Sequence, residues 1–229
     1  MPYNGYPKAF LFDLDGVLTD TAQFHYLAWK ELADHLELQF NKRDNERLKG
    51  VSREDSFEII LEINKVQDEF TVEQRKRCCE KKNVLYNRYL KNITQKDLLP
   101  GVKPFLEDAI QAGIKLAVAS ASHNAHTVLE RLKITDYFDY IADADYITHP
   151  KPDPEVFLDC SQHLGVSPEL CIGFEDAQAG IEAIKKAGMF AVGIHVKPGK
   201  YLPDLQLDST SKLNFSAIID AFNKAAYSC

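Results

Sequence analysis

Five short apolar runs, separated by helical patterns, constrain the fold of this chain more than any other feature of its sequence. The runs lie at residues 9–12, 115–119, 140–142, 171–174 and 190–194. Between them, apolar residues recur with helical spacing at residues 103–112, 124–132, 154–164 and 177–187. Alternation of strands and helices is typical of a parallel sheet with helices on both faces, so the sequence predicts an α/β fold. Residues 196–210 fit neither pattern, and we expect a loop there.

The alternation stops after the first apolar run. Residues 21–93 keep helical periodicity without a convincing strand. Within them, Ser52 and Asp55 have the S-x-x-D spacing of a capping box that opens a helix. We therefore expect a Rossmann-like parallel-sheet core, formed by residues 1–20 and 94–229, with a small helical domain inserted at residues 21–93.

Composition argues against two classes of partner. The 27 Lys and Arg residues are outnumbered by 34 Asp and Glu residues, which gives a net charge of −7, and no stretch concentrates the basic residues. A protein that binds nucleic acid through its phosphates needs such a basic patch, so we expect no nucleic-acid partner. The first residues lack a leader pattern, and no window approaches the ~18 apolar residues of a membrane span. We therefore expect no membrane segment and a cytoplasmic location.

Residues suited to chemistry follow the apolar runs or lie in the loop between two of them. They are Asp13, Asp15, Ser120, Lys151, Glu175 and Asp176. In open parallel sheets, ligands bind outside the carboxyl ends of the strands, so we expect one shared site. Carboxylates gathered there would repel one another without a cation, and a ligand set made only of oxygen suits Mg²⁺. A serine at a strand-to-helix junction and a lysine are suited to an anion such as phosphate.

Four segments are similar to the signature motifs of the haloacid dehalogenase-like phosphotransferase superfamily. They are residues 12–18 (Phe-Asp-Leu-Asp-Gly-Val-Leu), Ser120, Lys151 with Pro152, and residues 173–176 (Gly-Phe-Glu-Asp). The match spans nearly the whole core. The insertion directly after the first motif resembles the small helical cap domain of that superfamily. The resemblance implies a Mg²⁺-dependent phosphotransferase.

Further segments narrow the resemblance to the β-phosphoglucomutases within that superfamily. They are residues 19–21, 25, 28–29, 49–55, 120–122 and 175–181. Several of them lie in the expected cap, where this family selects its substrate. One departure is His123, where a lysine is usual in the family.

The resemblance implies a role for each matched catalytic residue. Asp13 would be the nucleophile that becomes an aspartyl phosphate, and Asp15 would be the general acid and base for the sugar hydroxyl. Ser120 and Lys151 would neutralise oxygens of the transferring phosphoryl group. The ligands of Mg²⁺ would be Asp13, the main-chain carbonyl of Asp15, Glu175 and Asp176.

The resemblance also implies a small-molecule sugar phosphate as substrate. β-D-glucose 1-phosphate and glucose 6-phosphate would interconvert through β-glucose 1,6-bisphosphate, an intramolecular phosphotransfer of the isomerase class. Arg53 would bind the phosphate that is not transferred. Relatives of this kind are usually monomers, and we expect a monomer here. The residues expected to contact the substrate are Thr21, His25, Trp29, Gly50, Val51, Ser52, Arg53, Lys82, Ala121, Ser122, His123 and Asn124.

Two alternatives use the same residues differently. A phosphatase on the same scaffold would use Asp13 and Asp15 identically and would release inorganic phosphate from a sugar phosphate. A signalling receiver module also combines acidic residues, a strand-end Ser or Thr and a Lys-Pro pair around a phosphorylated Asp. The chain length, the helical insertion and Asp15 argue against the receiver. Arg53 separates the mutase from the phosphatase, because only the mutase needs a second phosphate site.

Overall fold

The computed structural model describes residues 6–48 and 51–226. Their packing divides the chain into two compact units. Unit 1 consists of Met1–Asp20 and Thr94–Cys229, and unit 2 is Thr21–Ile93.

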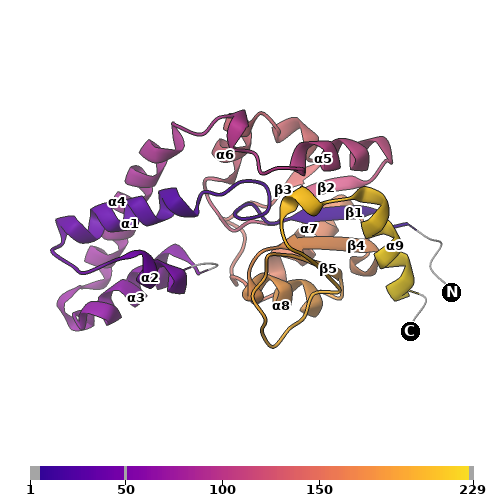
Figure 1. Ribbon diagram of the computed structural model, residues 1–229. Coiled ribbons are helices and arrows are strands. Elements are labelled where there is room, and N and C mark those ends of the chain that lie inside the picture. The colour runs from indigo at the N-terminus through magenta and orange to yellow at the C-terminus, as the bar shows by residue number, and fades with distance from the viewer. Residues whose placement is uncertain (1–5, 49–50, 227–229) are drawn as a thin grey trace. The chain divides into compact units, whose positions relative to one another are not determined.

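Unit 1 is built on a parallel sheet whose strand order, within the described residues, is β3-β2-β1-β4-β5-β6. The strands are β1 (Ala9–Phe12), β2 (Lys115–Val118), β3 (Tyr140–Ile141), β4 (Cys171–Glu175), β5 (Phe190–Ile194) and β6 (Leu205–Leu207). Every adjacent pair is parallel, and helices cover both faces of the sheet (Figure 1). The predicted α/β class with a Rossmann-like parallel sheet is therefore confirmed.

Five helices accompany the sheet in the described part of unit 1. They are α5 (Val102–Gln111), α6 (Ala125–Leu132), α7 (Glu155–Leu164), α8 (Gln178–Lys186) and α9 (Phe215–Ala226). The predicted helices of the core agree with α5 to α8 to within one or two residues at each end.

The expected loop at residues 196–210 is wrong in one segment, because β6 lies inside it. Residues 205–207 pair with β5 through Val192, Gly193 and Ile194. The strand is three residues long and lies at the edge of the sheet, so its side chains are only partly buried or exposed. A segment this short with little burial leaves no apolar pattern in the sequence.

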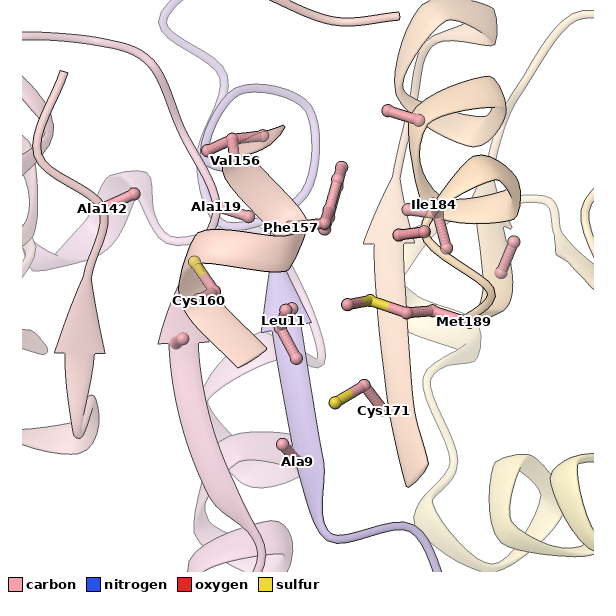
Figure 2. Packing of buried hydrophobic residues seen from close by; sticks show 14 of the residues in the cluster. Ala9, Leu11, Ala119, Ala142, Val156, Phe157, Cys160, Cys171, Ile184 and Met189 are labelled. Carbon is pink, nitrogen blue, oxygen red and sulfur yellow. The ribbon is translucent and has the colours of Figure 1, made fainter. Parts of the chain in front are cut away.

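Strand β1 lies in the middle of unit 1 and supplies side chains to both faces. Phe10 and Phe12 point to one face, where the ring of Phe10 stacks on Phe105 of α5 at 5.5 Å between centroids. Ala9 and Leu11 point to the other face, toward a buried cluster that includes residues of α7 and α8 (Figure 2). Burial on both faces explains why this strand is a continuous apolar run and not an alternating one.

Among its described residues, unit 2 contains helices joined by loops and no strand. Its helices are α1 (Ala22–His35), α2 (Lys42–Asn45), α3 (Arg53–Asn64) and α4 (Val72–Leu90). Helix α4 packs against both α1 and α3. At the centre, the buried ring of Trp29 stacks on Phe57 with 6.0 Å between centroids.

Helix α3 begins as the sequence predicts, with one difference in its cap. The hydroxyl of Ser52 accepts a hydrogen bond from the Asp55 amide at 3.1 Å. In a full capping box the Asp55 carboxylate would bond the main-chain amide of Ser52. Here the carboxylate accepts a hydrogen bond from the Ser52 hydroxyl at 2.7 Å instead.

The helices of the described chain fall short of a membrane span. Searched along their whole length, they contain no stretch that is both long enough and apolar enough to cross a bilayer.

Candidate active site

The strand order places two acidic strand ends beside each other. From β1 the chain proceeds to β2 and β3 on one side, and β4 then pairs with β1 on the other side. Such a reversal opens a crevice at the carboxyl ends of the two central strands, where open α/β sheets bind ligands. Asp13 follows β1, and its amide donates to the carbonyl of Phe174 in β4 at 3.0 Å. Glu175 is the last residue of β4.

Three carboxylates gather at this point. Oxygens of Asp13, Glu175 and Asp176 all lie within 4.8 Å of one another. Among the described residues, the side chain of Asp15 does not belong to this group. Its negative charge nevertheless raises the pKa of Asp176, after larger contributions from burial, Glu175 and Asp13. The site therefore concentrates negative charge around three carboxylates, with a fourth nearby.

The electrostatics of this cluster fit a divalent cation. Burial and the charge of Asp13 raise the pKa of Glu175 despite the opposing effect of Lys151. The pKa of Asp176 is raised as well. The ionised forms of Glu175 and Asp176 are therefore unfavourable when only protein groups surround them, because a single lysine, Lys151, offsets the charge of the three clustered carboxylates. Oxygen ligands at this spacing suit Mg²⁺, so the three carboxylates fit that ion.

Glu175 is held in one orientation. Its Oε1 accepts hydrogen bonds from the amides of Asp176 at 3.1 Å and Ala177 at 3.2 Å, and its Oε2 accepts one from Lys151 at 2.8 Å. A Cβ atom on Gly180, in the first turn of α8, would lie 1.9 Å from this Oε2. Glycine at position 180 therefore leaves the space that the carboxylate occupies.

A second glycine makes room for Asp176. Gly16 has a φ of +78°, which glycine adopts without strain, and a Cβ there would lie 2.2 Å from the Asp176 carboxylate. The Gly16 amide donates to the carbonyl of Thr19 at 2.7 Å, which closes a tight turn after Asp15. Neither glycine was among the predicted site residues, although Gly16 could be predicted to form a turn and both lie in segments that carry the family resemblance. A glycine in the first turn of a helix, where it costs stability, is the signal that could have identified Gly180.

Lys151 bridges two of the carboxylates. Its Nζ lies 2.5 Å from Oδ1 of Asp13 and 2.8 Å from Oε2 of Glu175. It also lies 4.9 Å from the ring centroid of Phe157 in α7. Burial alone would lower the pKa of Lys151, but the two carboxylates outweigh burial and raise it. The lysine is therefore a fixed positive charge beside the candidate nucleophile.

The predicted anion-binding segment lies after β2. Ala119 donates its amide to the Phe12 carbonyl at 2.7 Å. The buried Ser120 lies two residues after Val118, the residue of β2 that pairs with Phe12 at the end of β1. The hydroxyl of Ser120 accepts a hydrogen bond from the Ser122 amide at 3.3 Å. Since a hydroxyl accepts through its oxygen, its proton is still available as a donor.

The next residues form the approach to α6. The hydroxyl of Ser122 accepts the Asn124 amide at 3.3 Å. Asn124 is buried and immediately precedes the helix, whereas Ala121 is exposed. His123 is about half exposed, and its Nδ1 lies 3.2 Å from the carboxylate of Asp145.

Four of the predicted substrate-contacting residues lie together in unit 2. The ammonium of Lys82 lies 2.7 Å from Nδ1 of His25 and 5.1 Å from the ring centroid of Trp29. The hydroxyl of Tyr86 donates to Thr21 Oγ1 at 3.0 Å, and its ring lies 4.0 Å from that of His25. Tyr86 was not among the predicted residues, because a buried tyrosine in a helix has the pattern of an ordinary core residue.

Burial lowers the pKa of His25 well below its ordinary value, and the charges of Lys82 and Arg53 lower it further. The imidazole is therefore neutral near pH 7, and we assign its accepting nitrogen as the Nδ1 that faces Lys82. Arg53 is the first residue of α3, after Val51 and the capping residue Ser52. The predicted Gly50 lies outside the described residues.

Comparison with known proteins agrees with this geometry. A family model described as haloacid dehalogenase-like hydrolase matches residues 7–188. The β-phosphoglucomutase of Bacillus subtilis is 43% identical over 211 residues, which cover 92% of this chain and 93% of that protein. A phosphorylated carbohydrates phosphatase of Thermotoga maritima is 32% identical over 184 residues, which cover 80% of this chain and 82% of that protein.

A solved structure gives the same result for the fold. The crystal structure of a β-phosphoglucomutase from Clostridium difficile matches with a TM-score of 0.91 and 43% identity, over 96% of this chain and 99% of that one. The sequence match, the structural match and the acidic strand ends lead to one conclusion: the chain belongs to the haloacid dehalogenase-like hydrolase family.

Proposed function

We propose that the protein is a β-phosphoglucomutase, which interconverts β-D-glucose 1-phosphate and glucose 6-phosphate. One observation carries the proposal: 43% identity to the Bacillus subtilis enzyme over 92% of the chain, a span that includes the inserted helices as well as the sheet. The phosphate would pass through an aspartyl phosphate on Asp13. β-glucose 1,6-bisphosphate would be the intermediate that returns its other phosphate to the enzyme.

In this proposal, the unit 1 residues divide the phosphoryl and proton tasks. An oxygen of Asp13 attacks phosphorus, while Lys151 and Ser120 neutralise phosphoryl oxygens that would otherwise repel the carboxylate. Lys151 is suited to this task because its Nζ lies 2.5 Å from Asp13. Asp15 would take the proton from the accepting sugar hydroxyl and return it to the leaving one.

The carboxylate cluster would hold Mg²⁺. The side chains of Asp13, Glu175 and Asp176, with the main-chain carbonyl of Asp15, would supply the ligands. When bound, the ion offsets the charge of the carboxylates and of the phosphoryl group. The raised pKa values of Glu175 and Asp176 support this assignment, because they show that both charges lack sufficient compensation from the protein alone.

Unit 2 would supply most of the contacts that select the sugar phosphate. Arg53 would bind the phosphate that is not being transferred, through two parallel hydrogen bonds. Ser122, His123 and Asn124 of unit 1 would share that task. The remaining predicted contacts are Thr21, His25, Trp29, Gly50, Val51, Ser52, Lys82 and Ala121.

A sugar-phosphate phosphatase is the second candidate. The Thermotoga maritima phosphatase, 32% identical over 80% of this chain, favours it. His123 favours it too, because the lysine that is usual in the mutases supplies a compact positive charge for a phosphate, and that lysine is absent here. Both candidates use Asp13 in the same way and differ in whether the acceptor is sugar or water.

The products of one incubation distinguish the candidates. The protein is mixed with Mg²⁺, β-glucose 1-phosphate and a trace of β-glucose 1,6-bisphosphate, and glucose 6-phosphate and inorganic phosphate are measured in the same samples. The mutase proposal predicts many turnovers to glucose 6-phosphate with little free phosphate. Phosphate release with little glucose 6-phosphate would contradict it and favour the phosphatase.

A further inference from the structure

Glu155, the first residue of α7, folds its side chain back onto the loop that precedes the helix. Its Oε1 accepts hydrogen bonds from the amide of Thr148 at 2.9 Å and from the Thr148 hydroxyl at 3.0 Å. Its Oε2 accepts the amide of His149 at 2.6 Å and lies 2.7 Å from Nδ1 of that histidine. We assign the His149 tautomer that carries a proton on Nδ1, so four donor groups from two adjacent residues converge on one carboxylate.

These donors favour the ionised form of the Glu155 carboxylate. The amide of Thr148, followed by contacts with the His149 side chain and amide, lowers the pKa of Glu155 to about 2, although burial acts in the opposite direction. The carboxylate is thus ionised at any pH at which the protein would be assayed. Hydrogen bonds from main-chain amides to an ionised acceptor are stronger than those between neutral groups.

The residues between these two anchor points carry the lysine of the candidate active site. The amide of Asp153 donates to the Pro150 carbonyl at 3.0 Å, and Asp153 Oδ1 accepts the Glu155 amide at 3.0 Å. Lys151 lies inside this closed loop. Its ammonium sits 4.9 Å from the ring of Phe157, which belongs to the same first turn of α7 as Glu155. One turn of α7 therefore both fastens the loop and contacts the lysine that it presents.

The loop needs such a fastening for a physical reason. Residues 142–154 connect β3 to α7 without a helix or strand. A lysine reaches its target through a flexible four-carbon stem, so its ammonium is placed only as well as its main chain is. Ordering that main chain costs conformational entropy, which the hydrogen bonds of Glu155 help to offset.

We propose that Glu155 is a positioning residue that sets the place of the Lys151 ammonium beside Asp13, and with it the rate at which Asp13 accepts a phosphoryl group. The inference rests on the proposed function only for the role of Lys151 in neutralising the phosphoryl group. It holds whether the phosphate later goes to a sugar or to water.

The same side chains also have the spacing of a metal site, but their hydrogen bonds argue against that use. Ligand atoms of His149, Asp153 and Glu155 lie within 4.8 Å of one another. Both oxygens of Glu155 already accept hydrogen bonds from donors on Thr148 and His149. A cation would have to displace these donors, so we assign the cluster to fixing the loop.

The test measures phosphorylation of Asp13 by acetyl phosphate in excess Mg²⁺, which needs no sugar. Glu155→Gln keeps the size of the side chain but turns an amide N–H₂ toward donors. We expect the rate at saturating acetyl phosphate to fall about 30-fold, because sub-ångström errors in placement already cost much of the rate. The acetyl phosphate concentration for half-maximal rate should change by less than about 2-fold. Glu31→Gln is the matched control, because Glu31 has a similar side-chain exposure (27% against 26%) and pairs with Arg88 and Tyr89 of α4, outside the loop. Its rate should stay within about 2-fold of wild type.

A double-mutant cycle separates positioning from a general loss of structure. If Glu155 acts through Lys151, Glu155→Gln costs less than about 2-fold in a protein that already carries Lys151→Ala. An equal loss with and without Lys151 would overturn the proposal, as would a Glu155→Gln protein with the wild-type rate.

If Glu155→Gln does not fold, as measured by urea unfolding, His149→Ala decides the question. This variant removes one of the four donors from a side chain that is 70% exposed. We expect about a 3-fold lower rate in a folded protein, and no change in the rate would overturn the proposal. Because acetyl phosphate replaces the sugar phosphate, a wrong assignment of the mutase activity leaves these results unaffected.

Discussion

At the scale of single residues, the candidate active site depends on two glycines, which have no side chain, as much as on its charged residues. The Glu175 and Asp176 carboxylates occupy the space where side chains at Gly180 and Gly16 would begin. Acidic residues attract attention in a sequence because they carry charge. The glycines that give them room carry none, although the site cannot form without them.

Replacing Gly180 by alanine tests this directly. The new Cβ would lie 1.9 Å from Oε2 of Glu175, so the carboxylate must move away from its partners. We expect Gly180→Ala to weaken Mg²⁺ binding at least about 10-fold and to lower the free energy of unfolding by about 2 kcal/mol. Gly173→Ala is the control, because its Cβ would crowd the apolar side chain of Ile184 at 2.7 Å and no carboxylate. Calorimetric Mg²⁺ titration of both should show lost affinity in Gly180→Ala alone; equal affinities would contradict the assignment.

Arg53 gives the residue-scale test of the second phosphate. Arg53→Ala should lower the mutase rate about 100-fold, because a phosphate would lose a bidentate charged partner. Hydrolysis of p-nitrophenyl phosphate, which has a single phosphate, should fall by no more than about 3-fold. Arg77→Ala is the control, since Arg77 is 73% exposed and pairs with Glu73 on the same helix. Equal losses in the two reactions of Arg53→Ala would show that Arg53 does not bind a second phosphate.

At this scale the charged residues of the site could be predicted from the sequence, but the residues that hold them in place could not. Asp13 and Glu175 could be predicted to lie together because each follows an apolar run, and parallel strands end at the same edge of a sheet. The contact between Glu155 and Thr148 follows no such rule. It depends on the path of an irregular loop, which local sequence does not specify.

At the scale of elements, the reversal of strand order between β1 and β4 brings the carboxylates together. Burial at these strand ends raises the pKa values of Glu175 and Asp176. An acid whose pKa is raised on folding is less stable when ionised in the folded protein than in the unfolded one. The metal site therefore lowers stability until a cation is bound.

This gives a pH prediction with a defined sign. Without metal, the unfolded chain releases these protons at a lower pH than the folded protein does, so the free energy of unfolding falls as the pH rises from about 5 to about 8. Excess Mg²⁺ should stabilise the protein more at the higher pH, because it binds the ionised carboxylates. Urea unfolding with Mg²⁺ and with a chelator measures both effects. A stabilisation by Mg²⁺ that is independent of pH would count against the assigned ligands, and Asp176→Asn should flatten the dependence.

Elements with a strong apolar pattern could be predicted, and those without one could not. The run at residues 9–12 is buried on both faces and forms β1 with the predicted bounds. The edge strand β6 has only three residues that are partly buried or exposed, so its sequence resembles a loop. Pairing with β5, a long-range interaction, makes it a strand.

At the scale of the whole molecule, the candidate residues of the two units have different assigned roles. The candidate nucleophile, acid–base, lysine and metal ligands all belong to unit 1. Most residues assigned to recognising the sugar phosphate belong to unit 2, as do the buried contacts of Lys82 with His25 and Trp29. Relatives described as a β-phosphoglucomutase and as a phosphorylated carbohydrates phosphatase both match most of the chain, and thus parts of both units.

The fate of the phosphate on Asp13 tests the central claim most directly. The protein is labelled with radioactive acetyl phosphate in Mg²⁺, freed of excess donor, and mixed with β-glucose 1-phosphate or with buffer. We predict that the sugar phosphate removes the label much faster than buffer does, and that most of the label first appears in glucose 1,6-bisphosphate. Release of the label as inorganic phosphate at the same rate with and without the sugar phosphate would contradict the account.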